Sequence, residues 1–512
     1  MNIQKVRIHI LKNWEKYCLS LFIVVALILR FYNYPFRYNL SDEPIRDAAV
    51  ATIGARDLQL PLVGPFSSAG PFTFGPWYYY QLALARIVFQ VPYAPWIYLS
   101  IASVLCIFLL YKIGEFFDKK FGIILAFLGA ISASLILSGT HLTNPNLSNL
   151  FAFLSIYIFI KLIRKNHSYW WGFALGASLG IAINIHYQMM GLMILPLLLL
   201  VFKPKRYINI LCIGAGLFVT FLPMIFFDLN NHWFNFRNIL YYYTEGKKLI
   251  YVPNRWLFYV RDFWPSYIEE VTGLPGLVGA IVMIIFGGIF GYTIYKRKVS
   301  KELLVLVIAF VFNFILLRYY WGERFFGYLN YIRPFILIFE GYVIFYFYQL
   351  VKKGTIKKLY LLLVVVTLLI FNIPRIIPLL TKDKFTVQMY ETEQHLIAQY
   401  PNEKFKLFLC PGPGNTYYSS ESHSILFLLD SHKLLSDKGR PVGFENENCY
   451  PTGVRHVPDF EIKQANLTRI NGTDMIDLSS HSSASISAMH WQKHSLRLIS
   501  DTTTRWWFNE QP

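Results

Sequence analysis

A short run of acidic and basic residues near the N-terminus has the side chains best suited to chemistry. The segment NLSDEPIRDAAVATIGARDL, residues 39–58, carries four ionisable groups close together, namely Asp42, Glu43, Arg46 and Asp47. Ser41 is a good N-cap and Pro44 is tolerated in a first turn, so a short helix is predicted to begin at Asp42. A carboxylate there could take a proton from a hydroxyl. The same carboxylates could equally serve only to stabilise the positive end of the helix.

The same loop continues into an aromatic segment that we expect to lie beside the acids. Residues 64–85, GPFSSAGPFTFGPWYYYQLALA, combine a Gly- and Pro-containing turn with a Tyr-rich stretch. The stretch 77–90 is short and contains Arg86, which favours an interfacial helix on the outer membrane surface rather than a span. We expect Tyr78 and Tyr79 of this helix to contact substrate.

Composition restricts the class of protein. The chain has 512 residues, of which 55% are hydrophobic and only 15% charged, and its mean hydropathy is +0.39. In soluble domains about a quarter of the residues are charged. The low charged fraction and the apolar composition of this chain therefore indicate a membrane protein. The net charge of +18 does not indicate nucleic acid, because the basic residues fall in short clusters between apolar runs, which is how membrane topology is set.

These apolar runs predict a polytopic α-helical protein with about eleven transmembrane helices. The runs lie near residues 18–32, 96–113, 121–138, 147–163, 169–187, 189–202, 208–227, 273–295, 303–319, 332–350 and 357–373. Every second connection between the runs is basic. For a protein of the cell membrane this pattern predicts a cytoplasmic N-terminus and an extracytoplasmic C-terminal tail. The outer face would then carry residues 33–95, 139–146, 228–272, 320–331 and 374–512. We therefore expect a transmembrane module over 1–373 and a soluble domain over 374–512.

The tail is rich in polar residues and turn signals. FKLFL at 405–409 and SILFLL at 424–429 predict strands in a small α/β domain. Cys410 and Cys449 would share an oxidising compartment. They could form a disulfide there, or remain as two free thiols. Asn466-Leu-Thr and Asn471-Gly-Thr match the N-glycosylation sequon, a triplet that also arises by chance in such a tail.

The acidic pair after the first span, the Gly/Pro turn into a Tyr-Tyr helix and the paired spans that follow resemble GT-C membrane glycosyltransferases of the protein O-mannosyltransferase and aminoarabinose transferase type. The resemblance covers residues 15–200 and, less closely, 323–340. It implies transfer of a hexosyl or pentosyl group from a polyprenyl-phosphate donor to an acceptor hydroxyl on a protein, lipid or glycan. It also implies that Asp42 is the general base, while Glu43 orients the acceptor or a cation.

Further residues are candidates for substrate contacts. Arg46 could approach the leaving phosphate, since displacing a phosphate needs nearby positive charge. The segment FFGYLNYIRPF, 325–335, resembles a Tyr-containing segment of the family, which makes Tyr328 and Arg333 candidates for phosphate binding, although Arg333 could instead snorkel to headgroups. His186 could contact donor or acceptor, or be a hydrogen-bonded packing residue.

The chain departs from the family pattern at two places. Phe74-Gly75-Pro76 stands where the family often has Lys-Pro-Pro or His-Pro-Pro, and the loop THLTNPNLSN carries His141, Asn144 and Asn146 where an acid is common. His141 and Asn144 are therefore candidates for substrate binding. These departures favour a metal-free site or a different acceptor, and leave open whether a divalent cation takes part.

Two other functions compete with sugar transfer. A transporter or flippase usually shows internal repeats and broken, polar spans near mid-membrane, whereas here polar residues gather at the outer ends of the spans. A polysaccharide polymerase or ligase stays open, because the outer loop 228–270 carries Arg237, Arg255 and Arg261.

Overall fold

The computed structural model describes residues 3–67, 70–164, 169–203, 207–245, 255–319, 325–409, 420–446, 467–470, 473–477, 479, 492–493, 495–497 and 499–500. Cys410, Cys449, the asparagines of both sequons (Asn466 and Asn471) and the side chain of Asp42 lie outside the described residues. The chain forms two compact units. Unit 1 comprises Met1–Tyr32, Leu62–Tyr78 and Ile97–Thr381, and unit 2 comprises Asn33–Pro61, Tyr79–Trp96 and Lys382–Pro512.

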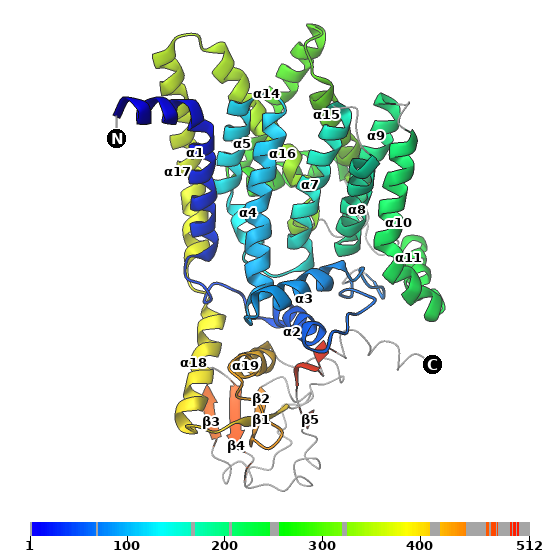
Figure 1. Ribbon diagram of the computed structural model, residues 1–512, viewed down its shortest axis with the longest axis vertical. Helices are drawn as coiled ribbons and strands as arrows, with labels where there is room; N and C mark the ends of the chain where they lie inside the picture. Colours follow the sequence, from blue (N-terminus) through cyan, green and yellow to red (C-terminus); the bar gives the residue numbers. More distant parts are fainter. Residues whose placement is uncertain are drawn as a thin grey trace. The chain divides into compact units, whose positions relative to one another are not determined.

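Unit 1 is built from long helices that lie side by side (Figure 1). Its helices are α1 (Ile3–Phe31), α4 (Ala94–Glu115, whose first turn belongs to unit 2), α5 (Lys119–Ile131), α6 (Ala133–Ser138), α7 (Asn144–Arg164), α8 (Tyr169–Ile185), η1 (Tyr187–Met193), α9 (Ile194–Phe202), α10 (Tyr207–Asn230), α11 (Phe234–Thr244), α12 (Arg255–Phe258), η4 (Tyr259–Phe263), α13 (Trp264–Thr272), α14 (Gly276–Tyr295), α15 (Lys301–Arg318), η5 (Phe326–Leu329), α16 (Arg333–Leu350) and α17 (Gly354–Leu380).

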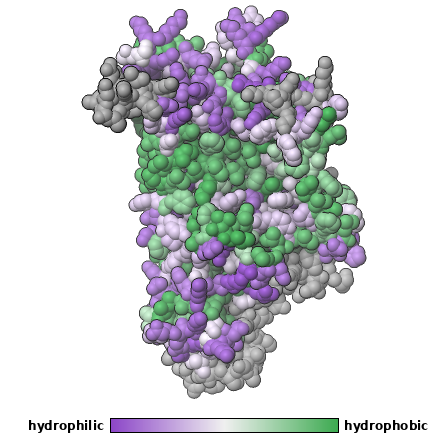
Figure 2. Space-filling view, viewed as in Figure 1, coloured by the Kyte–Doolittle hydropathy of each residue, from purple (hydrophilic) through white to green (hydrophobic). Residues whose placement is uncertain are grey.

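The apolar runs of the sequence lie on these helices. Among the described residues, five helical stretches are long and apolar enough to cross a membrane: Ala94–Glu115, Asn144–Arg164, Tyr207–Asn230, Gly276–Tyr295 and Gly354–Gln399. The visible face of unit 1 carries a broad band of hydrophobic residues (Figure 2), as a lipid-facing surface requires. The chain is thus a helical membrane protein, while the number of eleven spans and the orientation of the termini stay predictions.

Two of the predicted spans are interrupted, and each interruption has a local cause. The run 121–138 breaks between α5 and α6 at Ser132, which is extended and accepts a hydrogen bond from Leu135 N. The run 169–187 ends at Ile185, because His186 is also extended. Such breaks cannot be read from hydropathy, since the residues on both sides are equally apolar.

Small residues bring α8 and α10 into close contact. A Cβ atom built on Gly176 would lie 2.0 Å from the carbonyl oxygen of Ile213, and one on Gly216 would lie 2.3 Å from the carbonyl oxygen of Phe173. The two backbones therefore approach as closely as only glycine allows. Helices inside a bilayer often pack in this way. The hydrophobic effect does not drive them together in lipid, and small residues allow the close van der Waals contact that does.

Unit 2 combines the first-loop helices with the described part of the tail. It contains α2 (Asp42–Asp57), most of α3 (Trp77–Phe89), α18 (Lys384–Gln399) and α19 (Ser420–Ser431). A five-stranded sheet has the order β3-β4-β2-β1-β5, with β1 (Phe405–Leu409) parallel to β2 (Arg440–Asn446) and antiparallel to β5 (Gln492–Lys493). Strands β3 (Leu467–Ile470) and β4 (Thr473–Asp477) pair antiparallel.

Two sequence predictions in this unit are confirmed and one is wrong. Helix α2 begins at Asp42 after Ser41, and residues 405–409 form β1. The segment SILFLL at 424–429 is not a strand but the middle of α19. A continuous apolar run has no period that separates a buried strand from a buried helix, and here residues 425–429 are all buried by packing against α2 and α18.

Candidate active site

A stack of three rings marks the candidate site in unit 1. The ring of His186 lies between Phe74 and Tyr328, with centroid distances of 5.0 Å and 4.7 Å. His186 is only 5% exposed, and within the described residues its Nδ1 atom has no hydrogen-bond partner. A buried nitrogen without a protein partner is costly. It is therefore a position at which a ligand or water would be stabilised.

The turn that carries Phe74 is fixed by hydrogen bonds to the end of α8, to the start of η1 and to α11. Gly75 N donates to the carbonyl of Asn184 at 2.7 Å, and Tyr187 Oη donates to the carbonyl of Thr73 at 2.6 Å. Thr73 N donates in turn to Oδ1 of Asn235 at 2.8 Å. A Cβ on residue 75 would lie 1.7 Å from Asn184 Oδ1, so only glycine fits there.

The loop before α7 reaches the same region. Asn144 Nδ2 donates to the carbonyl of Ile185, the residue before His186, at 2.8 Å. Asn146 Nδ2 donates to the carbonyl of His141 at 2.8 Å. The structure thus brings the loop of His141 and Asn144 to the ring stack. The Asn144 amide therefore ties the start of α7 to the end of α8, and the Asn146 amide ties the first turn of α7 to the loop that precedes it.

Arg333 lies in a separate, buried polar cluster at the start of α16. Its NH1 atom donates to Asn149 Oδ1 at 2.9 Å and to Ser138 Oγ at 3.3 Å, and the side chain is 3% exposed. Three residues earlier, Asn330 Nδ2 donates to the carbonyl of Pro145 at 2.5 Å. The guanidinium therefore points into the helical bundle, and snorkelling to headgroups, which requires an exposed head group, is excluded.

Helix α13 is a part of the site region that the sequence did not reveal. Tyr267 Oη donates to the carbonyl of Leu329, the residue after Tyr328, at 2.6 Å, and both residues are fully buried. Sequence reasoning treated residues 228–272 as one irregular loop. The amphipathic stretch around Tyr267, ending at Gly273 in a left-handed conformation, was the signal available for a helix there.

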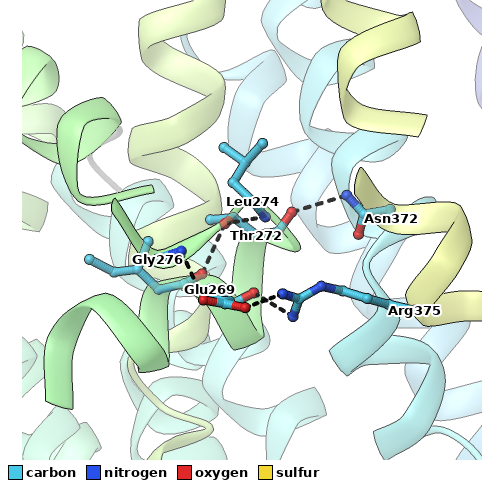
Figure 3. Close-up of polar contacts among 7 residues, drawn as sticks. Glu269, Thr272, Leu274, Gly276, Asn372 and Arg375 are labelled. Atoms are coloured by element: carbon cyan, nitrogen blue, oxygen red, sulfur yellow. Dashed lines mark hydrogen bonds and ion pairs between the residues drawn. The ribbon is translucent and has the colours of Figure 1, made fainter. Parts of the chain in front are cut away.

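The turn after α13 is tied to α17 by a second set of polar contacts (Figure 3). Glu269 forms an ion pair with Arg375 and accepts a hydrogen bond from Gly276 N at 2.8 Å. Asn372 Nδ2 donates to the carbonyl of Thr272 at 3.1 Å. Because these contacts join α13, α14 and α17, they hold α13 in place against the segment that carries Tyr328.

In unit 2, the charged residues of α2 form an ion pair that the sequence did not predict. The Nε and NH2 atoms of Arg46 both lie 3.0 Å from Oδ1 of Asp47. Tyr79 Oη donates to the same oxygen at 3.0 Å. Burial raises the pKa of Asp47, while the positive charge of Arg46 opposes that shift. Glu43 is exposed.

The candidate residues therefore fall into two groups, one in each unit. Unit 1 holds Tyr78, His141, Asn144, His186, Tyr328 and Arg333, and unit 2 holds Asp42, Glu43, Arg46 and Tyr79. Tyr78 and Tyr79 are both buried. Within the described part of the chain, no group of three or more His, Cys, Asp or Glu side chains is placed to hold a metal ion.

Comparisons with known proteins agree with this architecture. Residues 75–227 match the family model of dolichyl-phosphate-mannose-protein mannosyltransferases. Among curated proteins, no sequence matches the chain. The structure of ArnT from Cupriavidus metallidurans bound to undecaprenyl phosphate is similar, with 11% identity, a TM-score of 0.57, and coverage of 89% of this chain and 97% of that one. Its apo state gives 10% identity, a TM-score of 0.58, and coverage of 92% and 98%.

A third similar structure is the Archaeoglobus fulgidus oligosaccharyltransferase in complex with zinc and sulfate. It has 15% identity and a TM-score of 0.50, and the match covers 80% of this chain and 61% of that chain. At sequence identities this low, the structural similarity shows a shared fold.

Proposed function

We propose that this chain, a membrane protein with the GT-C fold, transfers a sugar from a polyprenyl-phosphate donor to an acceptor hydroxyl on the extracytoplasmic face of the membrane. The observation that carries the proposal is the ring stack of Phe74, His186 and Tyr328. It lies at the turn where the mannosyltransferase match begins, and His186 belongs to the same matched segment.

The fold supports the class of donor. The ArnT structure that resembles this chain over nearly its whole length holds undecaprenyl phosphate, a lipid whose tail needs an apolar surface and whose head needs cations or donors. In our proposal, Tyr328 and Arg333 bind the donor phosphate in unit 1. His186, whose Nδ1 atom has no hydrogen-bond partner among the described residues, contacts the donor or the acceptor together with His141, Asn144 and Tyr78.

The residues of α2 supply the acid–base chemistry in this proposal. Asp42 accepts the proton of the acceptor hydroxyl while the sugar leaves its phosphate, and Glu43 orients the acceptor. The role proposed for Arg46 is to stabilise the leaving phosphate, and its Nε and one terminal nitrogen are held by Asp47. Tyr79 fixes Asp47, and through it Arg46.

Replacing the proposed base tests the function. Asp42→Asn should lower turnover with a polyprenyl-phosphate sugar by at least about 10²-fold, the usual contribution of a general base. The matched control is Asp57→Asn at the other end of α2, where the carboxylate forms an exposed ion pair with Arg497. Purified protein would be assayed against a panel of polyprenyl-phosphate sugars.

Two results would overturn the assignment. Near-normal turnover of Asp42→Asn would remove Asp42 as the base. Movement of a labelled lipid-linked sugar across proteoliposomes, with no transfer to any acceptor, would replace the transferase by a transporter.

A further inference from the structure

The peptide segment that leads into α2 is held by the C-terminal part of the chain. Asp383 N donates to the carbonyl of Phe36 at 2.8 Å. The hydroxyl of Thr386, on α18, lies 2.7 Å from the carbonyl oxygen of Tyr38 and accepts a hydrogen bond from Leu40 N at 3.3 Å. These partners are about 350 residues apart in the sequence, and all belong to unit 2.

Helix α19 adds a second attachment at the same place. Ser424 Oγ donates to the carbonyl of Leu40, so both main-chain groups of this residue are bonded to tail hydroxyls. Leu40, Thr386 and Ser424 are completely buried. Buried main-chain groups need partners, and here the partners come from the tail rather than from the loop itself. The attachment point lies two residues before Asp42.

The same helix also reaches the far end of α2. Asp430, near the end of α19, forms an ion pair of 2.9 Å with Arg56 in the last turn of α2. Helix α19 therefore contacts α2 close to its first residue and again close to its last. An exposed ion pair contributes little free energy, so the buried hydroxyl contacts at Leu40 are the stronger restraint on where α2 begins.

We propose that the tail helices α18 and α19 position the acidic residues of α2, with Thr386 and Ser424 as the positioning residues. This inference deepens the proposed function and rests on it for its activity readout. A tail attached in this way is part of the catalytic apparatus rather than a separate acceptor-binding domain. Because a misplacement of about 1 Å can cost about 10²-fold in rate, the two hydroxyls should control turnover without touching substrate.

The test uses the full-length protein and the variants Thr386→Val and Ser424→Ala. Matched controls are Thr392→Val on α18 and Ser431→Ala on α19, because each of these hydroxyls donates to a carbonyl of its own helix. Thr386→Ser keeps the hydroxyl and should behave as the wild type. Hydrogen–deuterium exchange at the Leu40 amide and the following turn of α2 is measured together with kcat and KM for a polyprenyl-phosphate sugar.

We expect Thr386→Val to raise exchange at Leu40 about tenfold, which corresponds to one lost hydrogen bond. Ser424→Ala should raise exchange over the first turn of α2. Both variants should lower kcat while leaving the KM for the donor unchanged, and both control variants should match the wild type.

Failure of this inference can be told apart from failure of the proposed function. Wild-type exchange at Leu40 and its neighbours in both variants would overturn the positioning role, whatever the activity. A wild-type protein that transfers no sugar, in which the variants still raise exchange, would refute the transferase and leave the attachment of the tail established.

Discussion

A methyl group added at Gly75 is expected to disable the site while leaving the membrane fold intact. In Gly75→Ala the new Cβ would lie 1.7 Å from Oδ1 of Asn184. Rotation of the Asn184 side chain can move Oδ1 away, but its Cβ lies 2.7 Å from the new atom. An ordinary contact needs about 3.4 Å, so the turn and the end of α8 must separate by roughly 0.7 Å. Phe74 precedes the altered residue and would be displaced from His186. A shift that approaches 1 Å predicts a loss of up to about 10²-fold in kcat.

The assay compares this variant with two others. Gly287→Ala adds a methyl where nothing lies within 4 Å, and it should keep wild-type turnover. The double variant Gly75→Ala/Asn184→Gly removes the clashing side chain and should recover most of the lost activity, because replacing Asn, a weak helix former, by Gly costs only about 0.3 kcal/mol of helix propensity. Thermal unfolding in detergent controls for global damage. Full activity in Gly75→Ala alone would refute the proposed role of the turn.

Two further predictions concern unit 2. Asp47→Asn leaves the charge of Arg46 without its carboxylate. Because the Arg46 side chain is 29% exposed, the change should destabilise the protein by about 1–3 kcal/mol, whereas Asp57→Asn should cost under about 1 kcal/mol; equal unfolding temperatures for the two variants would contradict this. Burial, helped by the charge of Arg46, lowers the pKa of His423 from 6.5 to about 4. The unfolded chain therefore binds that proton more readily, so about 3 kcal/mol of stability should be lost as the pH falls from 6.5 to 4. His423→Gln should flatten this part of the pH–stability curve, and an unchanged curve would show that His423 is not its source.

Part of the architecture was predictable because it depends on local pattern. The apolar runs are helical because a backbone in lipid must satisfy its own hydrogen bonds. Helix α2 begins at Asp42 as the sequence predicts, with Ser41 at the N-cap position but without a side-chain capping hydrogen bond. The segment 405–409 is short and flanked by polar residues, and it forms a strand as predicted. The apolar segment 424–429 is just as short and is also flanked by polar residues, yet it is helical in the structure, so this local pattern does not separate the two.

The sequence by itself determined that this is a helical membrane protein, and it singled out the loops that carry polar residues. Only the tertiary structure decided which of those residues meet. His186 stacks between Phe74 and Tyr328, and Arg46 forms an ion pair with Asp47. Tail hydroxyls bind the main chain ahead of α2. The contacts of His186 and of the tail hydroxyls join segments that are far apart in the sequence. Which side chains meet depends on how the helices pack, and packing is set by long-range burial and not by local spacing.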